Sequence, residues 1–486
     1  MKYATSAFAF FLAICANAQW TVVYLHPDGM DVSVARGVSG GEQGGYVAED
    51  NGRYHPSLWN GTASSWTDLT PPGFFDGRVY GVRSGRQVGF SFENQTGTVR
   101  RHAILWSGAA ESAVSLMPGG MESSWGWGIS EDQQVGITGQ GTTARAALWS
   151  GTAESYVNLH PAGAENSQSN GVSGGQQVGY AGFADGLHAS LWNGTAASWV
   201  DLKPAGSGQS HALAVDAGQQ VGYADVDGVR RASVWTGTAG SWIDLNPTGV
   251  TESQASGVHA GQQVGYAHMV DGRDHAGMWF GTAGSWVDLH TFLLPGFTSS
   301  EARDISHEGA FTSVVGFGRF DGQPSLQAVM WVSRASAPTS YSIFRGSVIS
   351  GTLASLLSSD DDKLVMRPGA VFSNAEPPIQ IILNSTAPTS SPAGFSFSLE
   401  SNASIANAEQ KISLYNYVAG QYEVLDTRLA TTADDTVHVS VTTNTSRFIQ
   451  PLTMAIRARV SYRALGATFV YPWLGRIDKA WWAFPG

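Results

Sequence analysis

One position of an internal repeat changes its residue type while its neighbours stay nearly constant. It is occupied by Arg36, Tyr80, Trp127, Asn170, Leu213, Ser256 and Arg303, each two residues before a Val or Ile. The next residue is Gly or Ala, except for Asp304 in the last unit. Because this position varies, its side chains are not constrained by the packing that fixes the neighbouring positions. They are therefore expected to face a shared channel. Arg36, Tyr80, Trp127, Asn170, Arg303 and Asp304 would there bind a polar or anionic ligand. A solvated channel lining is the alternative.

Acidic residues near this position define a catalytic alternative. A glycoside hydrolase needs two carboxylates, one on each side of the bond that it cleaves. Asp304 is the first candidate for a hydrolase or lyase, with Glu301 or Asp216 as its partner. The sequence has no nucleophile elbow, no His-Glu-x-x-His and no phosphate-cradling loop. We therefore expect no catalytic residues, no metal and no cofactor, and keep the enzyme as the less favoured reading.

Tryptophan, histidine and aspartate recur at other fixed positions of the repeat. An apolar residue precedes Trp59, Trp106, Trp149, Trp192, Trp235, Trp279 and Trp331. Four units carry a histidine four residues earlier (His55, His102, His188 and His275), and Asp68, Asp201, Asp244 and Asp288 recur later in the unit. The tryptophans are expected to pack between units, with sugar stacking as the alternative. The histidines are expected to hydrogen-bond at the strand start, and the aspartates to accept from nearby backbone amides.

The tryptophans mark a repeat with spacings of 47, 43, 43, 43, 44 and 52 residues. One clean unit predicts four short strands at residues 198–202, 212–215, 220–224 and 231–235, separated by Gly, Pro or Asp-Gly turns. Asn51-Gly52, Asp185-Gly186, Asp227-Gly228, Asp271-Gly272 and Asp321-Gly322 recur between the third and fourth strands. Such pairs predict type I′ hairpins. Four antiparallel strands in about 43 residues are typical of one propeller blade.

The beginning of the repeats matches their end. Residues 22–27 correspond to residues 199–204, the last strand of a unit, whereas the seventh unit stops at Trp331, before that strand. An N-terminal strand that completes the final sheet would leave no open edge. We therefore predict an all-β fold, a seven-bladed β-propeller closed by the N-terminal strand over residues 19–333. A β-solenoid is the alternative, although it would need capping repeats.

The N-terminus predicts export. Lys2, the apolar residues 8–14 and Ala16-Asn17-Ala18 form a Sec-type signal peptide over residues 1–18, with cleavage expected after Ala18. The only cysteine, Cys15, lies inside it, so the exported chain would have no disulfide. We expect a secreted or extracellular protein. The net charge of −12 and the lack of a basic run argue against nucleic acid as a partner. No later apolar run reaches the length of a transmembrane span.

Residues after Trp331 have a different pattern. Residues 334–341 are predicted to be a linker, and alternating apolar runs over residues 342–486 predict a β-sandwich. Such sandwiches on exported proteins are often carbohydrate-binding or attachment modules, by analogy of fold alone. Asp360-Asp361-Asp362 has some calcium-loop character but no regular ligand spacing, so a solvated turn is expected.

The repeat resembles the bacterial extracellular HAF family. Its His-Ala stretch stands here as His102-Ala103-Ile104-Leu105-Trp106, His188-Ala189-Ser190-Leu191-Trp192 and His275-Ala276-Gly277-Met278-Trp279. The Gly-Gln-Gln-Val-Gly-Tyr runs at residues 175–180, 218–223 and 261–266 fit as well. The resemblance covers residues 20–332 and implies a secreted propeller-like protein, but no activity.

These observations favour a non-catalytic secreted or cell-surface protein that binds an extracellular glycan or protein. A structural component of the extracellular matrix or surface is the first alternative, and a propeller-type glycoside hydrolase or lyase is the second. The residues do not identify the ligand or the oligomeric state.

Overall fold

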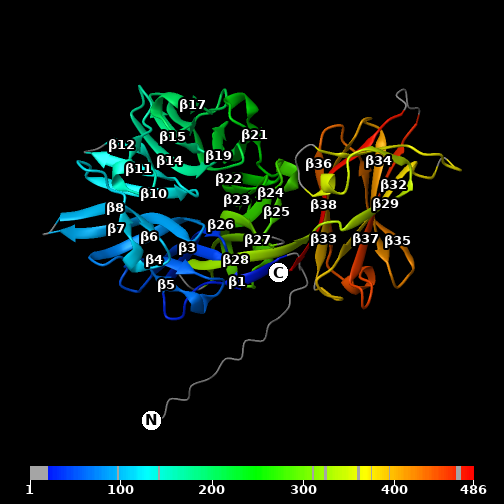
Figure 1. Ribbon diagram of the computed structural model, residues 1–486, viewed down its shortest axis with the longest axis horizontal. Helices are drawn as coiled ribbons and strands as arrows, with labels where there is room; N and C mark the ends of the chain where they lie inside the picture. Colours follow the sequence, from blue (N-terminus) through cyan, green and yellow to red (C-terminus); the bar gives the residue numbers. More distant parts are fainter. Residues whose placement is uncertain are drawn as a thin grey trace, which may run out of the picture. The chain divides into compact units, whose positions relative to one another are not determined.

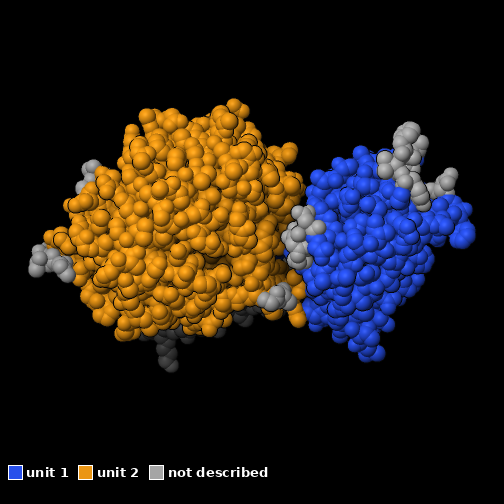
Figure 2. Space-filling model, turned by 45° about the horizontal axis from the view of Figure 1, so that its top comes forward, with its two compact units in different colours: residues 1–20, 336–485 blue, residues 21–335, 486 orange. Residues whose placement is uncertain are grey.

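The computed structural model describes residues 20–95, 98–140, 143–308, 311–321, 326–357, 362–373, 375–392, 394–466 and 472–485. This part of the chain is all-β, with strands and short 3-10 helices but no α-helix, and none of its helices is long and apolar enough to cross a membrane. One compact unit spans residues 21–335 and a second contains residues 336–485 (Figure 2). The predicted signal peptide lies outside the described residues.

Six four-stranded antiparallel sheets follow one another in chain order in the first unit (Figure 1). The first contains β2 (Val32–Ser39), β3 (Glu42–Ala48), β4 (Tyr54–Trp59) and β5 (Thr67–Asp68), and the second β6 (Phe74–Arg83), β7 (Arg86–Gln95), β8 (Thr98–Trp106) and β9 (Val114–Ser115). The third contains β10 (Ser123–Ile129), β11 (Gln134–Gln140), β12 (Thr143–Trp149) and β13 (Val157–Asn158), and the fourth β14 (Asn166–Ser173), β15 (Gln176–Phe183), β16 (Gly186–Trp192) and β17 (Val200–Asp201). The fifth contains β18 (Ser210–Asp216), β19 (Gln219–Val226), β20 (Val229–Trp235) and β21 (Ile243–Asp244), and the sixth β22 (Val250–His259), β23 (Gln262–Met269), β24 (Asp274–Trp279) and β25 (Val287–Asp288).

The first and last strands of this unit pair with each other. β26 (Phe297–Glu308), β27 (Phe311–Phe320) and β28 (Leu326–Ser336) form an antiparallel run, and β1 (Thr21–Tyr24) pairs antiparallel with β28, from Thr21 opposite Val332 to Tyr24 opposite Val329. Figure 1 shows β1 alongside β28. The innermost strands β2, β6, β10, β14, β18, β22 and β26 contact one another in sequence, and β26 contacts β2. The expected pairing of the N-terminal strand is present.

Each sheet packs on the next through the repeated tryptophan. All seven of these side chains are fully buried, so they cannot stack on a sugar. Trp106 shows their role, because it packs against Leu58 and Leu69 of the preceding sheet and donates from Nε1 to the Leu69 carbonyl at 2.9 Å. The prediction that these rings pack between units is confirmed.

The last strand of each sheet is shorter than predicted. Where the sequence predicts a strand over residues 198–202, the 3-10 helix η4 (Ala196–Ser198) comes first and β17 holds two residues. Equivalent turns stand in the other sheets: η1 (Ala63–Ser65), η2 (Ala110–Ser112), η3 (Ala153–Ser155), η5 (Ala239–Ser241) and η6 (Ala283–Ser285), with η7 (His290–Phe292) after the last of them. The serine that ends the turn explains the difference, since Ser198 Oγ donates to the Thr195 carbonyl and accepts from the Asn193 amide.

The type I′ turns lie mainly at the other hairpin of each sheet. Positive φ at both central residues occurs between the first and second strands, at Gly40-Gly41, Ser84-Gly85, Gly174-Gly175, Ala217-Gly218 and Ala260-Gly261. The Asn-Gly and Asp-Gly pairs lie between the second and third strands of the sheets, and there only Asp227-Gly228 confirms the prediction. It is wrong at Asn51-Gly52, Asp185-Gly186 and Asp271-Gly272, where Gly alone has positive φ, and Gly322 lies outside the described residues. The loops at Gly52 and Gly272 are one residue longer, a turn followed by a left-handed Gly.

The second unit contains two antiparallel sheets. One has the order β29 (Ser340–Arg345), β32 (Ile379–Thr386), β37 (Ala455–Ala464), β34 (Ala408–Asn416) and β35 (Gln421–Leu429). In the other, β30 (Ser347–Ser350), β31 (Leu364–Arg367), β38 (Gly475–Pro485), β33 (Phe395–Ala403) and β36 (Asp435–Val441) are neighbours. One hydrophobic cluster joins Ile381, Ile412 and Val460 of the first sheet to Phe397 and Trp482 of the second. The helices η8 (Ala354–Leu356) and η9 (Thr445–Phe448) complete this unit.

Two sequence predictions concern segments at the start of this unit and within it. The two compact units divide between residues 335 and 336, inside the predicted linker over residues 334–341, where β28 continues through Ser336 and β29 begins at Ser340. The Thr339 amide also donates to the Asn384 carbonyl, which ties this segment to β32. Of the predicted acidic turn, Asp360 and Asp361 lie outside the described residues, whereas Asp362 accepts a hydrogen bond from Ser355 at 3.0 Å.

Candidate functional site

A β-bulge in each innermost strand explains the variable repeat position. The pairing of β2 with β3 shifts register between Ala35 and Gly37, so that Arg36 is left without a partner opposite it. The same shift leaves Tyr80, Trp127, Asn170, Leu213, Ser256 and Arg303 unpaired in their strands. A bulge redirects a side chain out of the ladder. The extra residue of each sheet is therefore free to vary, while its neighbours are held by packing.

The Gly or Ala that follows the bulge is required by the approach of the next sheet. A Cβ added at Gly128 would lie 2.4 Å from the carbonyl oxygen of Asn170, and one added at Gly257 would lie 2.9 Å from Cα of Asp304. The innermost strands approach closest here, which brings the seven bulged residues together.

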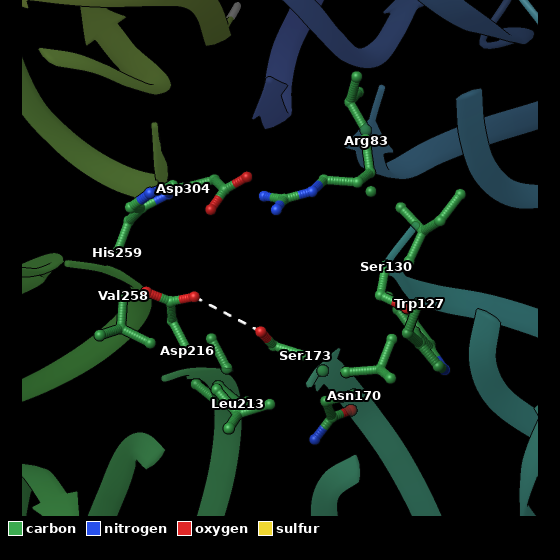
Figure 3. A pocket seen from close by; sticks show the side chains of 18 of the residues that line it. Arg83, Trp127, Ser130, Asn170, Ser173, Leu213, Asp216, Val258, His259 and Asp304 are labelled. Atoms are coloured by element: carbon green, nitrogen blue, oxygen red, sulfur yellow. Dashed lines mark hydrogen bonds between the residues drawn. The ribbon is translucent and has the colours of Figure 1, made fainter. Parts of the chain in front are cut away.

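These seven residues line one cavity of about 470 Å³. It contains all six residues predicted to bind a ligand, namely Arg36, Tyr80, Trp127, Asn170, Arg303 and Asp304, as well as Asp216. In Figure 3, side chains from different strands point toward a common space, with Trp127, Asn170, Leu213, Asp216 and Asp304 around it. Glu301 is not among the lining residues. Its carboxylate forms an ion pair with Arg303 at 2.5 Å.

The floor of the cavity combines aromatic and cationic groups. Tyr80 and Trp127, from neighbouring sheets, have ring centroids 4.3 Å apart at 60°. The Arg36 guanidinium lies 5.3 Å from the centroid of Tyr80, and that of Arg303 lies 5.2 Å from Phe317, both within cation–π range. Arg36, Tyr80 and Trp127 are half-buried, so part of each side chain remains accessible from the cavity.

Asn170 is oriented by its neighbours on β18. Its Nδ2 donates to the Ala212 carbonyl at 2.9 Å and lies 3.2 Å from Nε2 of His211. That contact requires an acceptor nitrogen, so His211 is neutral here. Burial lowers the pKa of His211, whose ring packs edge-on against Tyr180 at 4.4 Å. The Asn170 carboxamide therefore has a fixed direction at the cavity wall.

The cavity also contains titratable residues that follow the fixed Val or Ile. Arg83, Asp216 and His259 occupy this position, and Figure 3 shows the Arg83 guanidinium directed toward Asp304. Arg83 also donates from Nε to Glu131 at 2.8 Å. The sequence interpretation did not identify Arg83 and His259. The signal was present, because this position also varies, as Ser39, Arg83, Ser130, Ser173, Asp216, His259 and Ser306.

Asp304 joins the last sheet to the first. Its Oδ2 accepts from the Val38 amide at 3.0 Å, and its Oδ1 accepts from its neighbour, the Ile305 amide, at 2.9 Å. Burial raises the pKa of Asp304 to about 6, although the two backbone hydrogen bonds oppose this shift. Asp216 is held in a similar way, since its Oδ2 accepts from the Ala260 amide of the next sheet at 2.9 Å. Both carboxylates thus have structural partners.

In four of the sheets the repeated histidine, or the arginine that replaces it, pairs with the repeated aspartate, whereas His102 contacts Ser115 at 2.9 Å. His55, His188 and His275 contact Asp68, Asp201 and Asp288 through Nδ1, each at 2.8 Å. Arg231 replaces the histidine and contacts Asp244 at 2.8 Å. The second carboxylate oxygen of the aspartate accepts a hydrogen bond from the backbone amide two residues later, as predicted. For example, the Lys203 amide donates to Asp201. No group of three or more His, Cys, Asp or Glu residues in the described ranges is arranged to hold a metal ion.

No family model matches this chain, and a search of curated proteins finds no match. Among solved structures, propeller-type proteins are similar to it. A puromycin hydrolase is 12% identical with a TM-score of 0.41, and the match covers 63% of this chain and 53% of that protein. TolB from Acinetobacter baumannii is 10% identical, with a TM-score of 0.35 over 64% and 80% of the two chains. The propeller domain of the Trilobed protease from Pyrococcus furiosus is 8% identical, with a TM-score of 0.38 over 60% and 94%.

This chain thus spans about half the length of the puromycin hydrolase. At these identities the similarity concerns the fold alone. The chain is an all-β protein whose first unit repeats a four-stranded antiparallel sheet.

Proposed function

We propose that this protein is an exported, non-catalytic binding protein whose ligand site is the cavity lined by the seven bulged residues. In this proposal residues 1–18 are removed, residues 19–333 form a seven-bladed β-propeller of HAF-type repeats closed by β1, and the C-terminal region forms a β-sandwich. The six four-stranded sheets and the pairing of β1 with β28 support the ring. The two sheets that share one hydrophobic cluster support the sandwich.

The observation that carries the proposal is the convergence of six dissimilar polar or aromatic side chains on one cavity. Purely structural packing would favour the same small residue in every unit, as it does at the position after the bulge. Instead the bulged residues present two arginines and the Tyr80–Trp127 pair, beside the fixed amide of Asn170. Aromatic surface with a few oriented polar groups is typical of sites for glycans and for protein segments.

The partners of the acidic residues favour binding over turnover. A glycosidase needs one carboxyl group to donate a proton and a second to act as nucleophile or base. Asp304 and Asp216 each use one carboxylate oxygen to accept a hydrogen bond from a backbone amide of the neighbouring sheet. Glu301 is not among the lining residues, and its carboxylate pairs with Arg303. The hydrolase or lyase therefore remains the less favoured reading.

Arrays of glycans and of peptides test the proposal with the chain expressed from residue 19. Any ligand found is titrated in solution against wild type, Trp127→Ala and Arg83→Ala. We expect saturable binding that weakens about tenfold or more in each variant. Arg100→Ala, which removes an exposed arginine of β8 outside the cavity lining, is the matched control and should bind like wild type.

Three results would contradict the proposal. No saturable ligand on either array would favour the structural-component alternative. Equal affinity in wild type, Trp127→Ala and Arg83→Ala would place the ligand elsewhere. Cleavage of the ligand by wild type but not by Asp304→Asn would favour the enzyme.

A further inference from the structure

A second set of aromatic and cationic side chains lies on the sheet β29-β32-β37-β34-β35, labelled in Figure 1. β37 alternates in burial, since Ile456, Ala458 and Val460 are buried in the core whereas Arg457 is exposed and Arg459 half-buried. Successive strand residues point to opposite faces. Arg457 and Arg459 therefore lie on the face of the sheet that is turned away from the core.

Strand register places tyrosines on the same face. Tyr415 of β34 lies directly opposite Tyr422 of β35, and Leu414 beside it lies in the core opposite Ala458 of β37. On the other side of β37, Arg457 lies opposite Asn384 of β32. Asn384, Arg457, Tyr415 and Tyr422 thus form one row across four strands. With strands about 4.8 Å apart, this row is roughly 14 Å long.

The side chains of this row contact one another. The ring centroids of Tyr415 and Tyr422 are 5.1 Å apart, and Tyr417 lies 4.9 Å from Tyr415. The Arg459 guanidinium lies 4.2 Å from the centroid of Tyr422, and that of Arg457 lies 5.9 Å from those of Tyr415 and Tyr417. The result is an aromatic surface bordered by two guanidinium groups, which we call the Tyr/Arg face (Asn384, Tyr415, Tyr417, Tyr422, Arg457 and Arg459).

The positive charges of this face are not balanced by the chain. Other arginines of the unit have acidic partners: Arg428 pairs with Asp426 at 2.8 Å, Arg447 with Glu423 at 3.0 Å and Arg463 with Glu409 at 2.9 Å. Within the described residues, no ion pair is found for Arg457 or Arg459, and their guanidinium groups lie over aromatic rings. The chain as a whole has a net charge of −12. Two cations without an ion pair therefore border one aromatic surface of this sheet.

A hydrogen-bonding group on the face also lacks a partner. The hydroxyl of Tyr417 is buried, and no hydrogen bond to it is found among the described residues. A buried hydroxyl without a partner is unfavourable, because it has lost its hydrogen bonds to water. A ligand that carries hydroxyl or carboxylate oxygens could satisfy it.

We propose that the Tyr/Arg face binds an acidic polysaccharide. A sugar ring would pack against the tyrosine cluster, in which Tyr415 stands edge-on to Tyr422 at 72° and to Tyr417 at 80°. Carboxylate or sulfate groups of the chain would pair with Arg457 and Arg459, whose planar guanidinium groups bind such anions in two-point contacts. Asn384 would add hydrogen bonds to ring hydroxyls. A polysaccharide is preferred to an acidic protein segment, because its hydroxyl groups would hydrogen-bond along the row to Asn384 and the tyrosines while its repeated anions pair with the two arginines.

Affinity electrophoresis of the chain from residue 19 tests this site. The gels contain polygalacturonate, dextran sulfate, neutral dextran or polyglutamate. We expect retardation by at least one of the two acidic polysaccharides, with an affinity about tenfold or more above that for neutral dextran. Arg457→Ala/Arg459→Ala and Tyr415→Ala/Tyr422→Ala should each weaken it about tenfold or more. The arginine pair keeps the test valid if the tyrosine variant fails to fold.

Lys411→Ala is the matched control, because it removes a cation from the same sheet that already pairs with Glu409 at 3.3 Å. It should bind like wild type, and so should Trp127→Ala, which separates this site from the cavity. Retention by polyglutamate equal to that by the polysaccharides would overturn the proposal in favour of an acidic protein partner. Absence of retention by both acidic polysaccharides, or equal weakening by Lys411→Ala, would also overturn it.

Discussion

The backbone N–H of Ala328 donates to Ser33 Oγ at 2.8 Å, although the two residues are 295 positions apart in the chain. The same bond joins consecutive sheets elsewhere, from Ala146 to Ser167 at 2.9 Å and from Ala189 to Ser210 at 2.9 Å. The last sheet therefore contacts the first in the way that each sheet contacts the next. At the one seam without this bond, Pro56 has no N–H and Gly77 has no hydroxyl, so donor and acceptor are lost together.

Replacing these serines tests whether the closing contact is equivalent to the others. Ser33→Ala and Ser167→Ala should each lower the free energy of unfolding by about 1–2 kcal/mol, because a buried backbone N–H loses its partner. The two are well matched, since each serine is fully buried and also contacts a histidine, His26 or His160. Urea denaturation measures the effect, with the exposed Ser64→Ala as control. A large loss for Ser167→Ala with none for Ser33→Ala would speak against closure.

Gly128, the residue after the bulge of β10, should tolerate no side chain. Gly128→Ala would place Cβ 2.4 Å from the Asn170 carbonyl oxygen, so we expect a loss of about 2 kcal/mol in unfolding free energy and a displaced cavity wall. Gly119→Ala is the control, because it is exposed and a Cβ there meets nothing within 4 Å. Thermal and urea denaturation compare the two. Equal stabilities would show that the innermost strands are farther apart than described.

Ionisation of Asp304 should lower the free energy of unfolding as pH rises. Its folded pKa of about 6 exceeds its ordinary value of 3.8, so between these values the folded chain binds more protons than the unfolded chain. The contribution is complete below pH 3.8 and is lost as pH rises through about 6. Part of the residue faces the cavity, where water screens the charge. We therefore expect about 1–2 kcal/mol rather than the full value of the shift.

Asp304→Asn isolates this effect from the other titrating groups. The difference in unfolding free energy between wild type and variant is measured at several values between pH 4 and pH 7. Wild type should lose stability relative to Asp304→Asn across this range. A difference that stays constant, or that grows in favour of wild type with pH, would contradict the assignment.

The repeat made much of the first unit predictable. Fully buried tryptophans and fixed turns recur because every sheet has the same neighbours, so the period directly reflects packing. The bulged residues could be recognised because they vary between repeats. Arg36 and Trp127 occupy such a variable position, whereas the Gly that follows each of them has no room for a side chain. The pairing of His188 with Asp201 was not recognised, because 13 positions separate partners that the hairpin between β16 and β17 brings together.

Other features depend on geometry that the sequence does not display. Asp-Gly was expected to form a type I′ turn, yet the loop at Asp271-Gly272 is one residue longer and needs positive φ only at Gly272. Glu301 is two residues from Arg303, and only the bulge determines that Arg303 reaches the cavity lining while Glu301 does not. The Tyr/Arg face likewise depends on the register of β34 with β35, and the sequence of the second unit has no repeat from which this register could be predicted.

The pairing of β1 with β28 joins the N-terminal strand to the last sheet, and a disulfide tests that closure directly. Thr21 lies opposite Val332 in an antiparallel pair, where Cα atoms are about 4.5–5.5 Å apart, within the range that a disulfide spans. In the chain from residue 19, which lacks Cys15, Thr21→Cys/Val332→Cys should oxidise to one intramolecular disulfide and raise the melting temperature. Tyr24→Cys/Val332→Cys, three residues out of register, should not. Free thiols in the first variant, or equal oxidation of both, would contradict a ring closed by this strand.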